Sequence, residues 1–362
     1  MIDFIRKTSR PLRALGRATV FFLKVFPMLP SRPVDWVTHP PLIERVQYPT
    51  TDGIAEGEIY RPSSPGRHPG ILVCLGVVPF EVNHPQVPVL GRALARAGFA
   101  ALLYWSPAMR DFRLDPKDIN NIALAYQWLI EQPFVDASRS GLLGTCVGGS
   151  FALMAAAHPL IRQQVSYVSA YAPYSSLWTF SRDIASSTVD EQDGRRAWKV
   201  DQLTRKVFIH SLTAFLHPEE SGYLCRTFLE GEELDDESSL SEDGKAVAAL
   251  LSASSLAEAE SALEHLPDQI RQAFSGISPL TYAEDLQAPL VVLLHDRGDQ
   301  VIPIGETRRL CAALGQRAGL YFTEMQFSHL DPAKGKLPPL KLLREFSRFF
   351  GAVSRLFHHV VD

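Results

Sequence analysis

Residues 138–149 read SRSGLLGTCVGG, and this stretch decides the fold. It contains a short apolar run typical of a buried strand, and the small, apolar residues 147–157 that follow indicate a helix. Gly144 and Gly148 lie two positions before and after Cys146, where a sharp strand-to-helix turn crowds the backbone and requires glycine. The pattern predicts a nucleophile elbow that presents Cys146 at a helix N-terminus, where backbone amides stabilise a negatively charged sulfur. The alternative is a glycine-rich turn holding a buried, unreactive cysteine.

The segments on either side of this turn alternate between strand and helix. Residues 44–61 alternate polar and apolar side chains around a Thr-Asp-Gly turn, which predicts an antiparallel hairpin. Apolar runs predict strands at 70–76, 99–105, 165–172, 288–295 and 319–327, and helical spacing predicts helices at 87–97, 115–131, 306–315 and 341–357. This alternation predicts the α/β class, with a mostly parallel sheet covered by helices on both faces.

One long segment interrupts the alternation. Residues 175–276 contain no convincing β run. Within them, 229–243 is strongly acidic and indicates a solvated loop, whereas 245–274 has helical spacing. We interpret 175–276 as a large helical cap inserted into a core formed by 41–174 and 277–362.

The N-terminal segment, 1–40, is basic and amphipathic. Its cations Arg6, Lys7, Arg10, Arg13, Arg17 and Lys24 are interspersed with apolar side chains. The apolar run 18–23 is far shorter than the roughly 20 residues that a membrane-spanning helix needs. We expect either a peripheral contact with an anionic membrane surface or a helix packed on the protein's own surface.

Composition excludes several classes of protein. The net charge of -4 argues against nucleic acid as a partner, because nucleic-acid-binding domains are usually clearly basic. The cysteines at 74, 146, 225 and 311 include no Cys-x-x-Cys pair and suit neither a disulfide scaffold nor a zinc site. We therefore expect no metal and a reducing, cytoplasmic compartment, with membrane association left open by the N-terminal segment.

An acid and a histidine follow Cys146 in the chain. Asp299 comes just after the predicted strand 288–295, at the edge of a parallel sheet where functional residues gather. Asp296 is the alternative acid. His329 follows the last predicted strand, which makes the chain order nucleophile, acid, histidine. Such a histidine accepts the proton of the nucleophile, and the acid orients it.

Other histidines compete for the role of base. They are His84, His158 and His295. His158 falls at the end of the helix after Cys146, which is a packing position, and His295 could line the same cleft without being the base.

A tetrahedral intermediate needs hydrogen-bond donors for its oxyanion. The Val147 amide, directly after Cys146, is one candidate. The loop after strand 70–76 supplies the other, and we expect the Val77 amide to serve, because Pro79 has no N–H group.

With these residues in place, the sequence resembles the dienelactone hydrolase-like branch of the α/β-hydrolase superfamily. The matching motifs are Gly144-x-Cys146-x-Gly148-Gly149, Asp299-x-Val301-x-Pro303, His329, Pro133-x-Val135-Asp136 and Ser278-Pro279-Leu280. The resemblance implies the α/β-hydrolase fold, a Cys146–His329–Asp299 triad, hydrolysis of esters or lactones, and no cofactor. Family members also carry a glutamate in the oxyanion loop that contacts the resting cysteine, and Glu81 is a candidate modulator or else a solvated loop residue.

The chain departs from that family in its cap, which dienelactone hydrolases lack. We therefore expect a larger, apolar small-molecule substrate, an ester, lactone or thioester cleaved through an acyl-cysteine intermediate. One alternative is an acyltransferase that passes the acyl group to an amine or alcohol. Another is an inactive α/β-hydrolase scaffold that acts as a membrane-associated binding protein.

Overall fold

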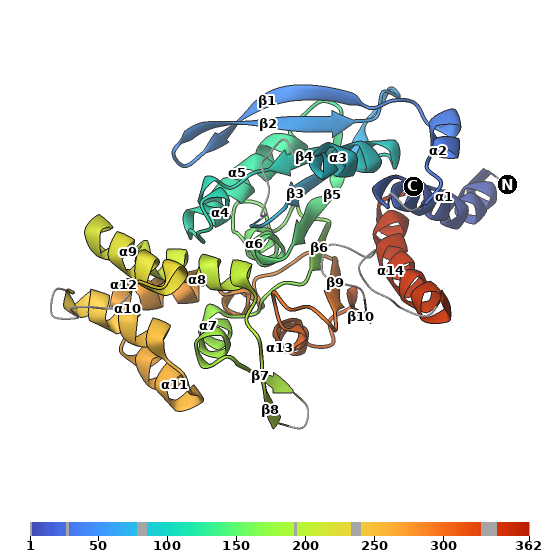
Figure 1. Cartoon of the computed structure of the whole chain (residues 1–362). Helices are drawn as coiled ribbons and strands as arrows, with labels where there is room; N and C mark the ends of the chain where they lie inside the picture. Colours follow the sequence, from blue (N-terminus) through green and yellow to red (C-terminus); the bar gives the residue numbers. More distant parts are fainter. Residues whose placement is uncertain are drawn as a thin grey trace.

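The computed structural model describes residues 2–26, 29–77, 85–191, 194–232, 240–326 and 339–361. Its centre is a sheet with helices on both faces (Figure 1). Helices from residues 175–276, called the helical insertion below, lie to one side of the sheet, and the N-terminal and C-terminal helices lie to the other.

The sheet has eight strands in the order β1-β2-β4-β3-β5-β6-β9-β10. Their bounds are Leu42–Thr50 (β1), Gly53–Arg61 (β2), His68–Cys74 (β3), Ala100–Tyr104 (β4), Val135–Thr145 (β5), Tyr167–Tyr171 (β6), Leu290–Asp296 (β9) and Leu320–Met325 (β10). The strand β2 is antiparallel to both of its neighbours, and all other neighbouring pairs are parallel. The predicted hairpin and mostly parallel sheet are confirmed, with strand ends that differ by a few residues.

Two apolar layers cover the sheet. On one face lie α5 (Lys117–Ile130), α6 (Val147–Ala156) and α13 (Ile304–Leu314), whose buried side chains join those of the helical insertion. On the other face lie α1 (Ile2–Val25), α3 (Gln86–Arg96) and α14 (Pro339–Val360). The short helices α2 (Arg32–Val37) and α4 (Pro107–Arg110) lie in connections.

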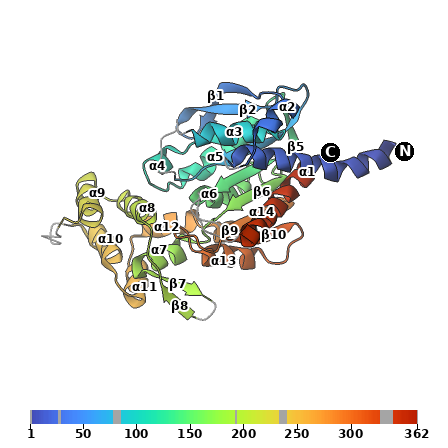
Figure 2. The same cartoon turned by 45° about the vertical axis from the view of Figure 1, so that its right-hand side comes forward.

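The N-terminal helix α1 packs on the protein itself. The Phe22 ring lies 5.1 Å from the rings of both Phe349 and Phe350 in α14, and the Phe26 ring lies 5.3 Å from that of Phe346. The chain thus realises the second of the two arrangements expected for this segment, at least for the C-terminal half of the helix. Figure 2 shows the N-terminal turns of α1 extending past the body of the protein. Among the described residues, no helix is long and apolar enough to cross a membrane.

The helical insertion contains a small hairpin that the sequence analysis missed. Strands β7 (Thr188–Glu191) and β8 (Gly194–Ala197) pair antiparallel, so the expectation that 175–276 holds no β structure is wrong. Arg195 on β8 binds Asp190 at 2.6 Å and Asp183 of α7 (Leu177–Ser186) at 2.7 Å. Ion pairs rather than an apolar alternation hold this hairpin, and so no strand pattern is visible in the sequence.

The remaining helices of the insertion are shorter than the sequence indicated. They are α8 (Gln202–Thr213), α9 (Pro218–Cys225), a π-helical turn at Arg226–Glu230, α10 (Glu242–Ser252), α11 (Leu256–Glu264) and α12 (Asp268–Gly276). The predicted helix 245–274 is broken twice. The first piece, α10, ends at Ser252. The Ser255 hydroxyl then accepts the Glu258 amide at 3.3 Å and caps α11, and Pro267 precedes α12.

The acidic segment 229–243 is only partly a loop. The π-helical turn takes up its first residues and α10 begins at Glu242, so the predicted loop was too long. Residues 233–239, which form its centre, lie outside the described residues.

Glu306 of α13 anchors the helical insertion where the chain leaves the core. Its buried carboxylate accepts the Ser175 amide at 2.7 Å, the Ser175 hydroxyl at 2.5 Å and the Thr179 hydroxyl at 3.0 Å, and also pairs with Arg309. These donors precede or belong to the first turn of α7, where a negative charge is favourable. One core side chain therefore satisfies the polar groups at the start of the insertion.

We expect Glu306→Gln to lower the free energy of unfolding by about 2 kcal/mol, because hydrogen bonds to a buried charged group are strong and an amide nitrogen would face donors. Urea unfolding measures this loss. The matched control is Glu324→Gln, which removes a half-buried partner of Arg308 and should cost under about 1 kcal/mol. Equal losses in the two variants would contradict the anchoring role.

Candidate active site

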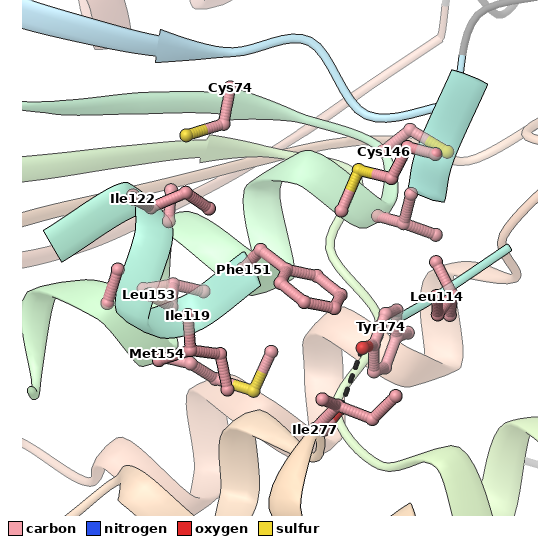
Figure 3. Close-up of a cluster of buried hydrophobic side chains, with 14 of the residues drawn as sticks. Cys74, Leu114, Ile119, Ile122, Cys146, Phe151, Leu153, Met154, Tyr174 and Ile277 are labelled. Carbon is pink, nitrogen blue, oxygen red and sulfur yellow. Dashed lines mark hydrogen bonds between the residues drawn. The ribbon is translucent and has the colours of Figure 1, made fainter. Parts of the chain in front are cut away.

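Cys146 lies at the turn between β5 and α6 in a strained backbone conformation, with φ 56° and ψ -136°. Its amide donates to the Tyr171 carbonyl at 2.8 Å, and its carbonyl accepts the Gly149 amide at 2.9 Å. Non-glycine residues with positive φ are uncommon and persist only where neighbouring structure enforces them. The predicted elbow geometry is present, and Figure 3 shows Cys146 close to the start of the helix that carries Phe151.

Glycines at the elbow let three backbone segments touch. A Cβ atom at Gly144 would lie 2.3 Å from the Gly148 carbonyl oxygen, and one at Gly148 would lie 2.4 Å from the Cys74 carbonyl oxygen. Gly76 has φ +76°, and a Cβ atom there would lie 2.6 Å from the Thr145 carbonyl oxygen. The sequence pattern predicts the first two requirements but not the one at Gly76, because that contact joins segments about seventy residues apart.

Backbone contacts bring Val77 and Val147, whose amides are the candidate oxyanion donors, to the same cavity. Val147 is the first residue of α6, so its amide has no acceptor within the helix. Val77 follows Gly76, whose backbone abuts Gly148. In the part of the chain that the structure describes, the backbone hydrogen bonds of turns, loops and caps include none donated by the Val77 amide. Both side chains are buried and line one cavity together with Cys146.

Asp299 lies in the loop between β9 and α13, and its side chain is fully buried. Its Oδ1 accepts the amides of Val301 at 2.7 Å and Ile302 at 3.1 Å, which fix the carboxylate in place. Val301 and Ile302 line the cavity that Cys146 lines. The loop that orients Asp299 is therefore part of the same site.

Asp296, the alternative acid, is also buried and accepts the Gly298 amide at 2.8 Å. Burial first, and then the negative charges of Asp299 and Asp296, raise the pKa of Tyr171, the last residue of β6. Both candidate acids lie at or just after the end of β9, which pairs with β6, and β6 in turn pairs with β5, the strand that leads into the elbow.

The candidate base His329 lies outside the described residues, and so do Glu81 and the competing His84. His295 is fully buried, with Nδ1 2.6 Å from the Thr307 hydroxyl and Nε2 2.9 Å from the Ile302 carbonyl. His158 has its pKa lowered by burial, and its Nδ1 accepts the Leu160 amide at 3.2 Å. These two histidines are held by structural contacts.

A narrow cavity of about 40 Å³ extends from Cys146 into the helical insertion. Its lining is Val77, Leu114, Cys146, Val147, Leu177, Phe180, Ser181, Ile184, Leu203, Thr204, Val207, Phe208, Ser211, Leu212, Phe274, Val301 and Ile302. The helices α7 and α8 contribute most of the apolar side chains. Phe180 and Phe208 of the insertion line the cavity, whereas its aromatic residues Trp178, Trp198 and Phe215 are not among the lining residues.

The hydroxyl groups of Ser181, Thr204 and Ser211 interrupt this apolar lining. Thr204 donates to the Val301 carbonyl at 2.8 Å, and the Ser211 hydroxyl accepts the Leu114 amide at 3.0 Å. These bonds tie α8 to the core loops around Cys146. No sequence signal pointed to them, because serine and threonine are common on helix surfaces. Within the described ranges, no three His, Cys, Asp or Glu side chains group closely enough to hold a metal ion.

Comparisons with known proteins show which proteins this chain is similar to. No family model matches the chain. A curated relative from Bradyrhizobium sp, described as a probable 2-oxo-3-(5-oxofuran-2-ylidene)propanoate lactonase, is 32% identical over 122 residues, which cover 30% of this chain and 48% of the relative. The match therefore spans about half of that relative's length.

Solved structures share the fold at low sequence identity. The 2,6-dihydroxy-pseudo-oxynicotine hydrolase matches with a TM-score of 0.53 and 14% identity over 89% of this chain and 69% of that chain. The α/β hydrolase GrgF from Penicillium sp. sh18 matches with a TM-score of 0.51 and 17% identity over 87% of this chain and 99% of that chain. The chain adopts the α/β-hydrolase fold, as the sequence predicted.

We expect Gly148→Ala to destabilise the protein by about 3 kcal/mol, because its Cβ would overlap the backbone of β3 and of the following loop. Thermal and urea unfolding measure the change. The control is Gly351→Ala in α14, where a Cβ meets nothing within 4 Å and helix propensity should stabilise by about 0.5–1 kcal/mol. A neutral Gly148→Ala variant would show that the close backbone approach is not required.

Proposed function

We propose that this protein is a hydrolase that cleaves a carboxylic ester, lactone or thioester through an acyl-cysteine intermediate. One observation carries the proposal: Cys146 occupies a strained turn at the start of α6, and it lines a cavity with Val77 and Val147. The amides of those residues are suited to hold an oxyanion. The partial similarity to a lactonase also supports hydrolysis of a cyclic or linear ester.

In the proposed reaction, His329 takes the proton of Cys146 and Asp299 orients the imidazolium. The sulfur attacks the carbonyl carbon, and the amides of Val77 and Val147 stabilise the oxyanion. Collapse of this intermediate breaks the bond to the alcohol or thiol, which leaves with the proton held by His329. Water, deprotonated by His329, then attacks the acyl-cysteine and releases a carboxylic acid and the Cys146 sulfur.

The structure favours Asp299 over Asp296 as the orienting acid. Two successive amides fix one oxygen of Asp299, and the loop that supplies them lines the cavity. A fixed carboxylate is what the orientation of a catalytic histidine requires. The role of Glu81 as a modulator of the resting cysteine stays a prediction.

We propose that the helical insertion acts as a cap that selects an apolar acyl group. Phe180 and Ile184 of α7 and Val207 and Phe208 of α8 face the cavity that begins at Cys146. A cavity of this kind excludes water and rewards substrates that bury hydrocarbon. The cytoplasmic location and the peripheral membrane contact of the N-terminal segment stay predictions.

Removal of the nucleophile tests the reaction directly. We expect Cys146→Ala to abolish turnover of p-nitrophenyl esters and acyl thioesters, because no sulfur remains to form the acyl-enzyme. Release of p-nitrophenol or thiol measures the rate, and mass spectrometry of the wild type detects the acyl adduct. Cys311→Ala is the matched control and should keep wild-type rates. Full turnover by Cys146→Ala would refute the covalent mechanism.

A series of esters with increasing acyl length tests the cap. We expect Phe208→Ala to shift the best substrate to a longer chain, because the lost ring lengthens the cavity, with a several-fold change in relative kcat/KM. Phe215→Ala removes an insertion phenylalanine that is not among the lining residues and should leave the preference unchanged. The same shift in both variants would mean that the insertion does not select the substrate through this cavity.

A further inference from the structure

A second apolar cavity lies on the opposite face of the sheet. It encloses about 250 Å³ between the helices α1, α3 and α14 and the strands β5, β6, β9 and β10. Figures 1 and 2 show α1 and α14 on the side of the sheet away from the helical insertion. The cavity shares no lining residue with the one at Cys146. It is therefore a separate site from the candidate active site.

This cavity is much larger than ordinary packing defects. Protein interiors are close-packed and hold few voids larger than a water molecule. Its walls are almost wholly hydrocarbon, with Phe21 and Val25 from α1, Leu94 from α3 and Val353 and Leu356 from α14. Apolar cavities stay dry and take up apolar ligands of matching size. The cavity is thus suited to a hydrocarbon chain.

One polar group in the wall supplies a point of attachment. Ser169 of β6 lines the cavity and is only 7% exposed, and its hydroxyl has no hydrogen-bond partner among the described residues. Thr145, which also lines the cavity, already donates its hydroxyl to the Leu75 carbonyl at 2.8 Å. The Ser169 hydroxyl is therefore available to a ligand in the cavity that carries a hydrogen-bonding group.

The charges of the residues that line the cavity limit the class of ligand that it can bind. Among the described residues that line the cavity, none is lysine, arginine or histidine. Tyr171, which also lines the cavity, pairs with Leu294 of β9, two residues before Asp296. An anionic head group would find no counter-ion among the described lining residues.

We propose that this cavity binds a neutral single-chain lipid, of the fatty alcohol class, with its alkyl chain between α1 and α14 and its hydroxyl group hydrogen-bonded to Ser169. The proposal does not depend on the hydrolase activity, because it involves neither Cys146 nor the cavity that Cys146 lines. In this arrangement α1 closes the lipid site from one side.

Isothermal titration calorimetry with 1-octanol on the full-length protein tests the proposal. We expect one equivalent to bind the wild type. Because no described lining residue is a cation that would compensate the charge, we expect octanoate at pH 8 to bind at least tenfold more weakly. Ser169→Ala should weaken 1-octanol binding about fivefold, the net effect of one lost hydrogen bond.

Variants that fill one cavity or the other locate the site. Val25→Trp and Val353→Trp place a large ring in the second cavity and should abolish binding, whereas Val207→Trp fills the cavity at Cys146 and should leave it intact. Circular dichroism and urea unfolding establish that each variant folds, and either of the two filling variants suffices. The proposal is overturned if 1-octanol does not bind, if a folded filling variant still binds it, if only Val207→Trp loses it, or if octanoate binds as tightly.

Discussion

The rest of the site depends on one steric constraint, the contact of three backbone segments at the elbow. Gly148 presses on Cys74 and Gly76, and Gly144 presses on Gly148, at separations that exclude any side chain. This contact ties the end of β3, the end of β5 and the start of α6 together. As a result, Cys146 occupies a strained turn, and Val77 and Val147 line the same cavity as Cys146.

The second organising feature is that the helical insertion leaves and rejoins the core at adjacent points. The Tyr174 hydroxyl donates to the Ile277 carbonyl at 2.7 Å, as Figure 3 shows, and the Leu280 amide donates to the Ser175 carbonyl at 3.0 Å. Glu306 binds the outgoing segment at Ser175 from the core side. The insertion is therefore clamped at its base, and its helices α7 and α8 supply walls of the cavity that Cys146 lines.

The two faces of the sheet differ in how they are closed. The face beneath the elbow carries α5 and α6 in a continuous core, with small residues that let α6 approach the sheet closely. The opposite face is closed by α1 and α14 through phenylalanine rings, which leave a hydrocarbon-lined space against β5 and β6. Residues 143–145 line that space, and Cys146, which follows them in the chain, lines the cavity on the other face. The end of β5 therefore borders both cavities.

The α/β class, the core strands and the elbow are predictable from the residues alone, because strand and helix periodicity and the glycines around Cys146 reflect local geometry within a few residues. The sequence also placed Asp299 at the end of β9, since the carboxyl ends of parallel strands share one edge. Only the tertiary structure decided that Gly76 must be glycine, that ion pairs from Arg195 form a hairpin, and that Phe180 and Phe208 rather than Trp198 line the cavity. Each of these rests on contacts between distant segments, whose partners are set by topology and not by the residues nearby in the chain.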